Sequence, residues 1–321
     1  MDEKLLSIVI TAFNEEKYLN RCVDSIINAL GDSFNKVEII ISNNNSTDKT
    51  LEIAEEYCKQ YSNIFVYTST KQGPSVARNF GIQYSNCKYI TFIDGDDYVD
   101  GNLLEVLNTL EKYEDVDIFQ LTCHIHKNGE TLIPKLCEDE QYNKKISQQE
   151  FLDNLKLDAG FSSSSGRIIN KNLIVSNNLQ YDERFMQMED MEFGVRLWVR
   201  AKTFVFLDKP YYHYETRHEN SLTNKISLKR MLQGVGASAT AISYLLSRED
   251  CKRYKKLFQF VSLLSYSLIR RYKELTKEEK QIFLKELKKN KIILNYPYYF
   301  STKLFYIVYK VFGLKVALKF V

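Results

Sequence analysis

Three aspartates follow directly on a short apolar segment in the first third of the chain. Residues 89–93 (YITFI) have the β-branched and aromatic composition of a buried strand, and they lead into Asp94, Gly95, Asp96 and Asp97. Asp94 and Asp96 are two positions apart, so in extended backbone their carboxylates point the same way. A divalent cation relieves that repulsion, and oxygen ligands suit Mg²⁺ or Mn²⁺, which leave further positions to substrate phosphates. The alternative is a solvated acidic turn, because Asp-Gly is also a common turn dipeptide.

Segments of alternating strand and helix character lie around these aspartates. Strands are predicted at residues 6–12, 37–41, 64–67 and 89–93, with helices at 14–29, 49–60 and 76–84 between them. Asn14 is the expected N-cap of the first helix, followed by acids in its first turn. Strands joined by helices through short polar junctions are typical of a parallel sheet covered on both faces.

Polar residues cluster where three of these strands end, at residues 11–15, 43–48 and 94–97. In a parallel sheet, ligands bind outside the carboxyl ends of the strands. The three clusters are therefore expected to line one crevice. This placement favours a metal and phosphate site over a solvated turn.

The middle of the chain continues the mixed pattern. A helix to about residue 113, a strand at 116–122, a hairpin at 124–133 around Asn128-Gly129, helices at 148–157 and 188–201 and a strand at 204–207 are predicted. His124 and His126 share a strand face. They are either a metal pair or exposed or packed histidines, and the second interpretation is favoured because no third ligand lies nearby in sequence.

The C-terminal region is helical and basic. Helices are predicted at 228–246, 252–271 and 277–289, with a last apolar segment from residue 300 that carries spaced lysines. Residues 225–321 hold 21 Lys and Arg against 6 Asp and Glu, whereas residues 1–224 hold 23 against 35. The last segment is expected either to dock on the preceding helices or to lie on an anionic membrane surface. Nucleic acid is not an expected partner, because the lysines alternate with apolar residues at helical spacing.

Composition limits the class of protein further. The chain has 321 residues, 44% of them hydrophobic, which is enough for about two domains, predicted at 1–224 and 225–321. Its six cysteines are scattered without a Cys-x-x-Cys pair, which favours reduced thiols in the cytoplasm over a disulfide framework or a zinc site. The first residues do not resemble a secretory signal, and no apolar run is long enough to span a bilayer.

Five segments together resemble the family 2 glycosyltransferases of the GT-A fold. They are residues 7–15 (SIVITAFNE), 46–48 (STD), 73–81 (GPSVARNFG), 94–97 (DGDD) and the pair Glu189-Asp190. They occur in the family's order and spacing over about residues 5–210. The resemblance implies an α/β architecture, with a Rossmann-like, mostly parallel sheet covered by helices and a C-terminal helical extension.

The resemblance also implies a nucleotide-diphosphate sugar as the donor and Mn²⁺ or Mg²⁺ as the cofactor. The positions implied to contact the donor or the metal are Thr11, Phe13, Glu15, Arg78, Asp94 and Asp96, the last as a metal ligand. Asp190 is implied as the general base, and Glu189 as a residue that orients the acceptor or caps its helix. Arg78 paired with an acid, and Phe13 in the core, are the structural alternatives.

The sequence departs from the family where Asn43, Asn44 and Asn45 replace the usual Asp-Asp-Gly. An asparagine accepts a hydrogen bond through its carbonyl oxygen but also donates one. Uridine remains the expected base of the donor nucleotide. Cytidine, thymidine and guanosine are stronger alternatives than is usual for this family. Lys71 stands where the family often has Asn and would add positive charge near the phosphates.

Two residues farther along the chain are further candidates. Arg217 is expected to clamp the diphosphate from a mobile loop. His213 either completes the metal shell or, as favoured here, packs or faces the acceptor.

The function expected from this resemblance is that of an inverting hexosyl- or N-acetylhexosaminyltransferase. Its acceptor would be a growing cell-surface polysaccharide, such as a capsule, or a glycolipid or other lipid-linked glycan, and it would work in the cytoplasm or on the inner face of the cell membrane. A sugar-nucleotide nucleotidyltransferase is one alternative, but the first strand lacks a glycine-rich phosphate loop. A membrane-associated scaffold of the same fold is the other. The presence of Asp94, Asp96, Asp190 and Arg78 argues against the scaffold.

Overall fold

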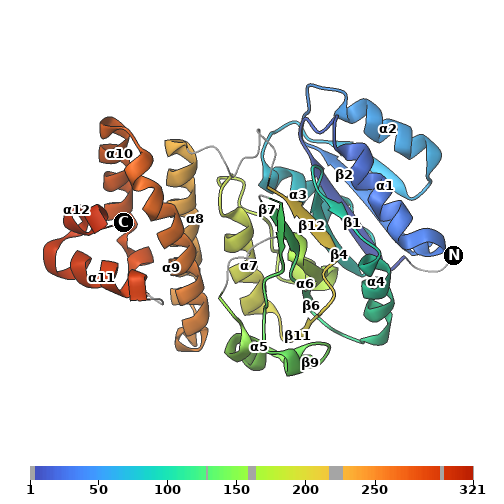
Figure 1. Ribbon diagram of the computed structural model, residues 1–321. Helices are drawn as coiled ribbons and strands as arrows, with labels where there is room; N and C mark the ends of the chain where they lie inside the picture. The colour runs from blue at the N-terminus through green and yellow to red at the C-terminus, as the bar shows by residue number, and fades with distance from the viewer. Residues whose placement is uncertain (1–3, 128, 158–163, 217–226, 297–299, 321) are drawn as a thin grey trace. The chain divides into compact units, whose positions relative to one another are not determined.

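The computed structural model describes residues 4–127, 129–157, 164–216, 227–296 and 300–320 (Figure 1). The chain packs as two compact units. The first comprises Met1–Glu183 with Arg200–Glu219, and the second comprises Arg184–Val199 with Asn220–Val321. The predicted division of the chain between residues 224 and 225 stays a prediction.

An eight-stranded sheet in the order β3-β2-β1-β4-β10-β6-β11-β9 forms the centre of the first unit. The four strands predicted first are β1 (Leu6–Ala12), β2 (Val37–Asn43), β3 (Ile64–Thr68) and β4 (Tyr89–Asp94), and all of them pair in parallel. The other half of the sheet is β10 (Arg167–Asn170), β6 (Ile118–Gln120), β11 (Thr203–Phe206) and β9 (Lys145–Ser147). There β10 and β9 run antiparallel to their neighbours, while β6 and β11 pair in parallel. The predicted mostly parallel α/β architecture is confirmed.

The strand register brings the predicted polar clusters to one edge of the sheet. Thr11 pairs with Asp94 across β1 and β4, and Ala12 pairs with Asn43 across β1 and β2. The side chains of successive β1 residues point to opposite faces of the sheet. Ile8 and Ile10 join the core on one face, and Val9 meets a helix on the other.

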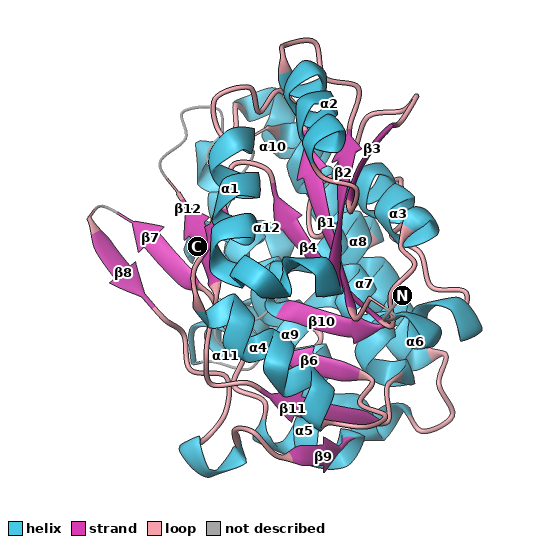
Figure 2. Cartoon of the chain, turned by 90° about the vertical axis from the view of Figure 1, so that its right-hand side faces the viewer, coloured by secondary structure: helices cyan, strands magenta, loops and turns pink. Residues whose placement is uncertain are grey.

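Helices cover both faces of this sheet (Figure 2). In chain order they are α1 (Leu19–Leu30), α2 (Thr50–Gln60), α3 (Pro74–Tyr84), α4 (Asn102–Lys112), α5 (Gln148–Asn154) and α6 (Lys171–Ser176). The α3 helix lies very close to β1, because a Cβ placed on Gly81 would come within 2.2 Å of Val9 Cγ1. Glycine at position 81 is therefore a requirement of packing.

The predicted start of the first helix is wrong. The α1 helix begins at Leu19, with Tyr18 as its N-cap. Asn14 instead has a left-handed backbone with φ 59°, and its side chain accepts a hydrogen bond from the Thr47 N–H at 2.8 Å. Asparagine tolerates a left-handed backbone and is common in turns. The hydrogen-bonding side chain that suggested a helix N-cap therefore stabilises a loop at this position.

A small second sheet in the order β5-β12-β7-β8 completes the first unit. Its strands are β5 (Tyr98–Val99), β12 (Tyr212–Glu215), β7 (His124–Lys127) and β8 (Glu130–Leu132). The predicted hairpin is confirmed by the antiparallel pairing of β7 with β8, although Asn128 of its turn lies outside the described residues. In β12, His213 pairs with Tyr98 on one side and His124 on the other. Three distant segments thus meet at one point.

The second unit is helical. It contains α7 (Glu189–Arg200), α8 (Leu228–Leu246), α9 (Lys255–Ile269), α10 (Lys277–Lys289), α11 (Phe300–Phe312) and α12 (Leu314–Ala317). The predicted bounds of α8 and α10 are confirmed. Trp198 of α7 is buried, with its ring centre 5.5 Å from that of Phe260 in α9. Within the described part of the chain, no helix is both long and apolar enough to cross a membrane.

Candidate active site

The turn after β4 gathers three of the predicted donor-binding residues. The Thr11 hydroxyl donates to Asp94 Oδ1 at 2.8 Å, and Arg78 Nη2 lies 3.2 Å from the same oxygen. Arg78 is buried, and its guanidinium carbon lies 5.5 Å from the centre of the Tyr181 ring. The sheet edge and the α3 helix therefore hold one carboxylate, one hydroxyl and one guanidinium together.

Glu15 packs against the same turn. The Gly95 N–H donates to the Thr11 carbonyl oxygen at 2.9 Å. A Cβ placed on Gly95 would lie 3.1 Å from that oxygen and 3.2 Å from Glu15 Cγ, so a glycine allows the close approach. Glu15 thus lies beside the aspartates, as the sequence predicted for a residue of this site.

The charge around Glu15 perturbs its ionisation. Burial, and after it the negative charges of Asp96, Asp94 and Asp48, raise the pKa of Glu15 to about 8. Glu15 is therefore a protonated carboxylic acid at neutral pH, able to donate a hydrogen bond. The same effect shows that negative charge is concentrated at this edge of the sheet.

Glu15 is expected to make the protein less stable as pH rises. Between pH about 4.5 and about 8 the native state keeps the Glu15 proton while the unfolded state loses it, so the free energy of unfolding falls as pH increases. Glu15→Gln should flatten this part of the profile. The measurement is urea unfolding across that range in the presence of a chelator, with Glu16→Gln as a matched exposed control. Parallel profiles for the wild type and Glu15→Gln would contradict the prediction.

Asp96 and Asp97 have different surroundings. Asp96 is half-buried, and its carbonyl oxygen accepts a hydrogen bond from Arg21 Nη2 of α1. Asp97 is buried and accepts from the Tyr212 hydroxyl and, at 2.9 Å, from the Glu215 N–H. Burial, and after it the charges of Asp96 and Asp94, raise the pKa of Asp97 well above its ordinary value. Asp97 therefore joins the turn to β12.

Two loops beside the turn are tied together. The Glu15 N–H donates to Thr50 Oγ1 at 2.7 Å, and the Glu16 N–H donates to Asp48 Oδ2 at 3.1 Å. Phe13, which precedes these residues, keeps 42% of its surface exposed. The alternative that Phe13 belongs to the core is therefore wrong, and its ring is presented to solvent at the edge of the sheet.

The asparagines and Lys71 make contacts within the protein. Asn43 Oδ1 accepts from the Ser46 N–H at 3.2 Å and its Nδ2 donates to Thr68 Oγ1 at 3.1 Å, while Asn44 Oδ1 accepts from the Gly73 N–H at 3.0 Å. Both asparagines are buried. Lys71 is exposed, with its Nζ 3.4 Å from Glu183 Oε2. The amides of Asn43 and Asn44 thus position the neighbouring loops, and Lys71 lies at the surface.

The second acid pair belongs to the second unit. Glu189 and Asp190 form the first turn of α7, as predicted; Glu189 is buried, and Asp190 Oδ1 accepts from the Met191 N–H at 2.7 Å. Arg217 lies outside the described residues.

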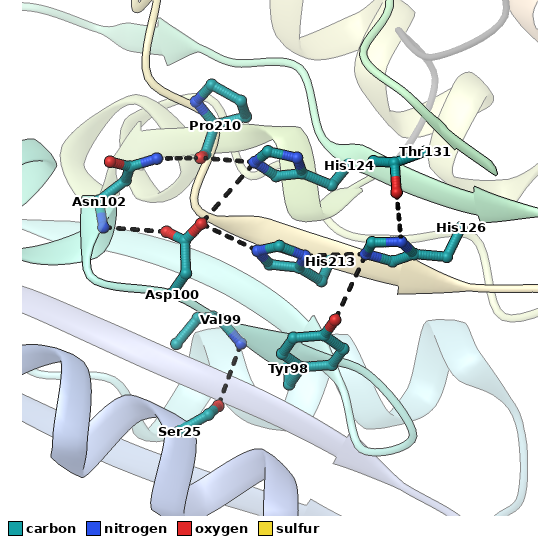
Figure 3. Close-up of polar contacts among 10 residues, drawn as sticks. All are labelled: Ser25, Tyr98, Val99, Asp100, Asn102, His124, His126, Thr131, Pro210 and His213. Atoms are coloured by element: carbon teal, nitrogen blue, oxygen red, sulfur yellow. Dashed lines mark hydrogen bonds and ion pairs between the residues drawn. The ribbon is translucent and has the colours of Figure 1, made fainter. Parts of the chain in front are cut away.

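His213 belongs to a cluster of imidazoles on the small sheet (Figure 3). Its Nε2 lies 2.9 Å from Asp100 Oδ2, and its Nδ1 lies 2.8 Å from His126 Nε2. The rings of His124 and His213 stack with centres 4.2 Å apart. Burial is the largest cause of a lowered pKa at His213. The favoured prediction is of exposed or packed histidines, and the rings of His124 and His126 are half-buried and packed with His213. The assumption that no third ligand lies near His124 is wrong, because the fold brings Asp100 and His213 to it.

Several of these residues were not recognised from the sequence. Arg21, Tyr181 and Asp100 come from segments without a distinctive motif. Arg21 lies in the first turn of an amphipathic helix, and Asp100 follows the two-residue strand β5. A regular pattern does not distinguish such positions, so their proximity to the site depends on the tertiary fold.

Known proteins resemble this chain in sequence and in structure. The profile of the family described as Glycosyl transferase family 2 matches residues 7–175, more than half of the chain. EpsH of Bacillus subtilis (strain 168) is 27% identical over 259 residues, which cover 80% of this chain and 73% of EpsH. From the same organism, EpsJ, an uncharacterized glycosyltransferase, is 31% identical over 225 residues, which cover 68% of this chain and 63% of EpsJ.

A solved structure supports the fold. The crystal structure of S. aureus TarS 1-349 in complex with UDP-GlcNAc superposes with a TM-score of 0.77 at 17% sequence identity. The superposition covers 98% of this chain and 90% of TarS 1-349. The likeness therefore extends over both units of the chain.

Proposed function

This chain belongs to glycosyl transferase family 2, and on that premise we propose that it transfers a sugar from a nucleotide-diphosphate donor to a hydroxyl group, with inversion at the anomeric carbon. The observation that carries the proposal is that the Thr11 hydroxyl and the Arg78 guanidinium both contact Oδ1 of Asp94 at the edge of the sheet. In parallel sheets this edge is where ligands bind.

We propose a UDP-sugar as the donor. TarS, which shares the fold, has been crystallised with UDP-GlcNAc. The exposed Phe13 ring offers a surface for a base, and Glu15 lies beside the Asp94 turn, where its carboxyl would contact the nucleotide. Asn43 and Asn44 are engaged with neighbouring loops, which leaves cytidine, thymidine and guanosine to be tested beside uridine.

Mn²⁺ or Mg²⁺ is the proposed cofactor, with Asp96 and Asp94 as the protein ligands. The carboxylates of Asp96, Asp94 and Asp48, whose charges add to burial in raising the pKa of Glu15, fit a hard cation with oxygen ligands. When bound, such an ion neutralises charge on the departing diphosphate. The chain itself would contribute Arg78, which holds Asp94, and Arg21, which holds the backbone of Asp96.

Asp190 is the proposed general base. A carboxylate within hydrogen-bond reach of the acceptor hydroxyl takes its proton as the new glycosidic bond forms, and the donor's bond to the diphosphate breaks in the same displacement. One displacement inverts the anomeric centre. Glu189 would orient the acceptor, and Arg217 would contact the diphosphate.

The test of this function is donor turnover and binding across UDP-, CDP-, GDP- and dTDP-sugars, with and without Mn²⁺. Binding and slow hydrolysis of one UDP-sugar, dependent on the metal, is the expected result. A failure to bind any donor would reject the transferase and favour a scaffold of the same fold.

The proposed acceptor is a cell-surface polysaccharide, such as a capsule, or a lipid-linked glycan at the inner face of the cell membrane. We propose that the α11 helix contacts this membrane face. Leu304, Ile307 and Val311 are 47%, 56% and 65% exposed. They recur at helical spacing, so they form one apolar stripe, and Lys303 and Lys310 are exposed on the same helix. An apolar stripe with lysines suits the interface of an anionic bilayer.

Ile307→Asp is expected to weaken binding to vesicles of anionic phospholipid by about tenfold or more, because it removes one apolar anchor and adds a repelled charge. The measurement is vesicle co-sedimentation of the whole protein. Ile282→Asp is the matched control, because Ile282 is 52% exposed on α10, outside the stripe. Equal losses in the two variants, or no binding by the wild type, would contradict the role of α11.

A further inference from the structure

We propose that Asp100, His124 and His213 form a second metal site, for a transition-metal ion such as Zn²⁺, separate from the carboxylates of Asp94 and Asp96. Within the described residues, these three side chains offer ligand atoms that all lie within 4.8 Å of one another. Two imidazole nitrogens and one carboxylate oxygen are the donor set of many Zn²⁺ and Fe²⁺ sites, whereas Mg²⁺ prefers oxygen ligands alone.

The distances suit a small ion. Asp100 Oδ2 lies 2.9 Å from His213 Nε2 and 3.8 Å from His124 Nε2. Ligand atoms around a tetrahedral zinc, at bond lengths of about 2.0–2.1 Å, are about 3.3 Å apart. The two distances to Asp100 bracket this value, and all three ligand atoms lie within 4.8 Å of one another. Because the His124 and His213 rings are stacked, a turn of at least one ring about its side-chain bonds would direct both nitrogens at one ion, with the fourth position left for water.

The carboxylate is already oriented for this role. Asp100 Oδ1 accepts from the Asn102 N–H at 2.9 Å, which directs Oδ2 toward the imidazoles (Figure 3). The His124 ring lies 3.2 Å, through Nε2, from the Pro210 carbonyl oxygen, and that oxygen also accepts from Asn102 Nδ2 at 2.9 Å. His124 can therefore turn its nitrogen to a metal without leaving the carbonyl unpaired.

A second layer of residues would hold His213. His126 Nε2 faces His213 Nδ1 at 2.8 Å, and His126 Nδ1 faces Thr131 Oγ1 at 2.9 Å. Without metal, protons on His213 Nε2 and His126 Nε2 satisfy the chain of hydrogen bonds to Asp100. With metal on His213 Nε2, both rings carry their proton on Nδ1, and they donate to His126 and Thr131. Each ring keeps one proton, so the change of tautomer needs no proton from solvent. A hydrogen-bond partner on the imidazole nitrogen that does not bind the metal, as His126 provides for His213, is common at metal-bound histidines.

The three ligands come from three separate segments. Asp100 follows β5, while His124 lies in β7 and His213 in β12. These strands have two, four and four residues, and a metal would add bonds across all three. The proposed ion would therefore stabilise the small sheet by linking its strands. This proposal does not rest on the proposed transfer reaction.

The test is Zn²⁺ binding to the untagged, chelator-stripped full chain, measured by competition with a chromophoric chelator in the absence of donor. We expect one zinc ion per chain. Asp100→Ala, His124→Ala and His213→Ala should each weaken binding by more than about 100-fold, and His126→Gln by about 10- to 100-fold. Asp96→Ala is the matched control and should retain the wild-type zinc affinity.

Two further measurements keep the test decisive. Zinc should raise the melting temperature of the wild type and of Asp96→Ala but not of His124→Ala, and circular dichroism reports whether each variant is folded. Co²⁺ in the site should absorb as a nitrogen- and oxygen-ligated ion. Equal zinc affinity in all variants, loss of the site in Asp96→Ala, or thiolate-to-cobalt absorption from a cysteine site would each overturn the proposal.

Discussion

Asp96→Ala is expected to lower kcat/KM for sugar transfer by about 10³-fold and to abolish the stimulation of donor binding by Mn²⁺. Removing one preorganised group that stabilises developing charge commonly has an effect of this size. The reason here is that the proposal makes the Asp96 carboxylate a ligand of the ion that neutralises charge on the departing diphosphate. Asp94, the other proposed ligand, also accepts a hydrogen bond from Thr11 and pairs with Arg78, so a change at Asp96 tests the metal with less disturbance of these contacts.

The measurement is transfer kinetics and donor titration over a range of Mn²⁺ concentrations. Asp208→Ala removes an exposed carboxylate from the same unit and should leave both quantities unchanged. If Asp96→Ala keeps a metal-dependent affinity like that of the wild type, Asp96 is not a ligand. If it keeps full transfer activity, the assignment of this turn to the donor diphosphate is wrong.

Asp190→Asn is expected to bind the donor as tightly as the wild type while kcat for transfer falls by about 10²- to 10⁴-fold, the usual contribution of a general base. Asparagine keeps the size of aspartate and can still accept from the Met191 N–H, but it does not take up the acceptor proton. Single-turnover transfer together with donor binding by calorimetry separates the two quantities.

Glu278→Gln is the control for Asp190→Asn, because it makes the same acid-to-amide change at an exposed position of α10. A loss of donor affinity in Asp190→Asn that matches its loss of rate would show a binding role. Unchanged transfer would remove Asp190 from the mechanism, and Glu189→Gln would then become the variant to measure.

The parts of the fold that sequence patterns predicted are those with local periodicity. The first four strands are buried apolar runs, and α8 and α10 have continuous apolar faces, so their positions follow from the spacing of hydrophobic residues. The antiparallel β10 between β4 and β6, and the two-residue β5, were not predicted. Their pairing partners are far away in sequence, and a short strand has no periodicity of its own.

The candidate site was predictable to a similar extent. Thr11, Arg78 and Asp94 came from motifs in different segments, and the parallel sheet brings them together as expected. Only part of the histidine cluster was predictable, because the residues that join His124 and His126 there are distant from them in sequence. Asp100 and His213 reach those residues through the order of strands in the small sheet, which no spacing in the chain encodes.

Asp97 has a consequence for cooperativity. Both of its carboxylate oxygens are bonded to β12, through Tyr212 and Glu215, while its neighbours form the turn that would hold the donor. The adjacent residue of β12, His213, contacts Asp100 and His126. The donor turn and the histidine cluster are thus connected through neighbouring residues of β12. If an ion at the histidine cluster changes the affinity for the donor, the donor must change the affinity for that ion by the same factor, because thermodynamic coupling between two binding sites is reciprocal.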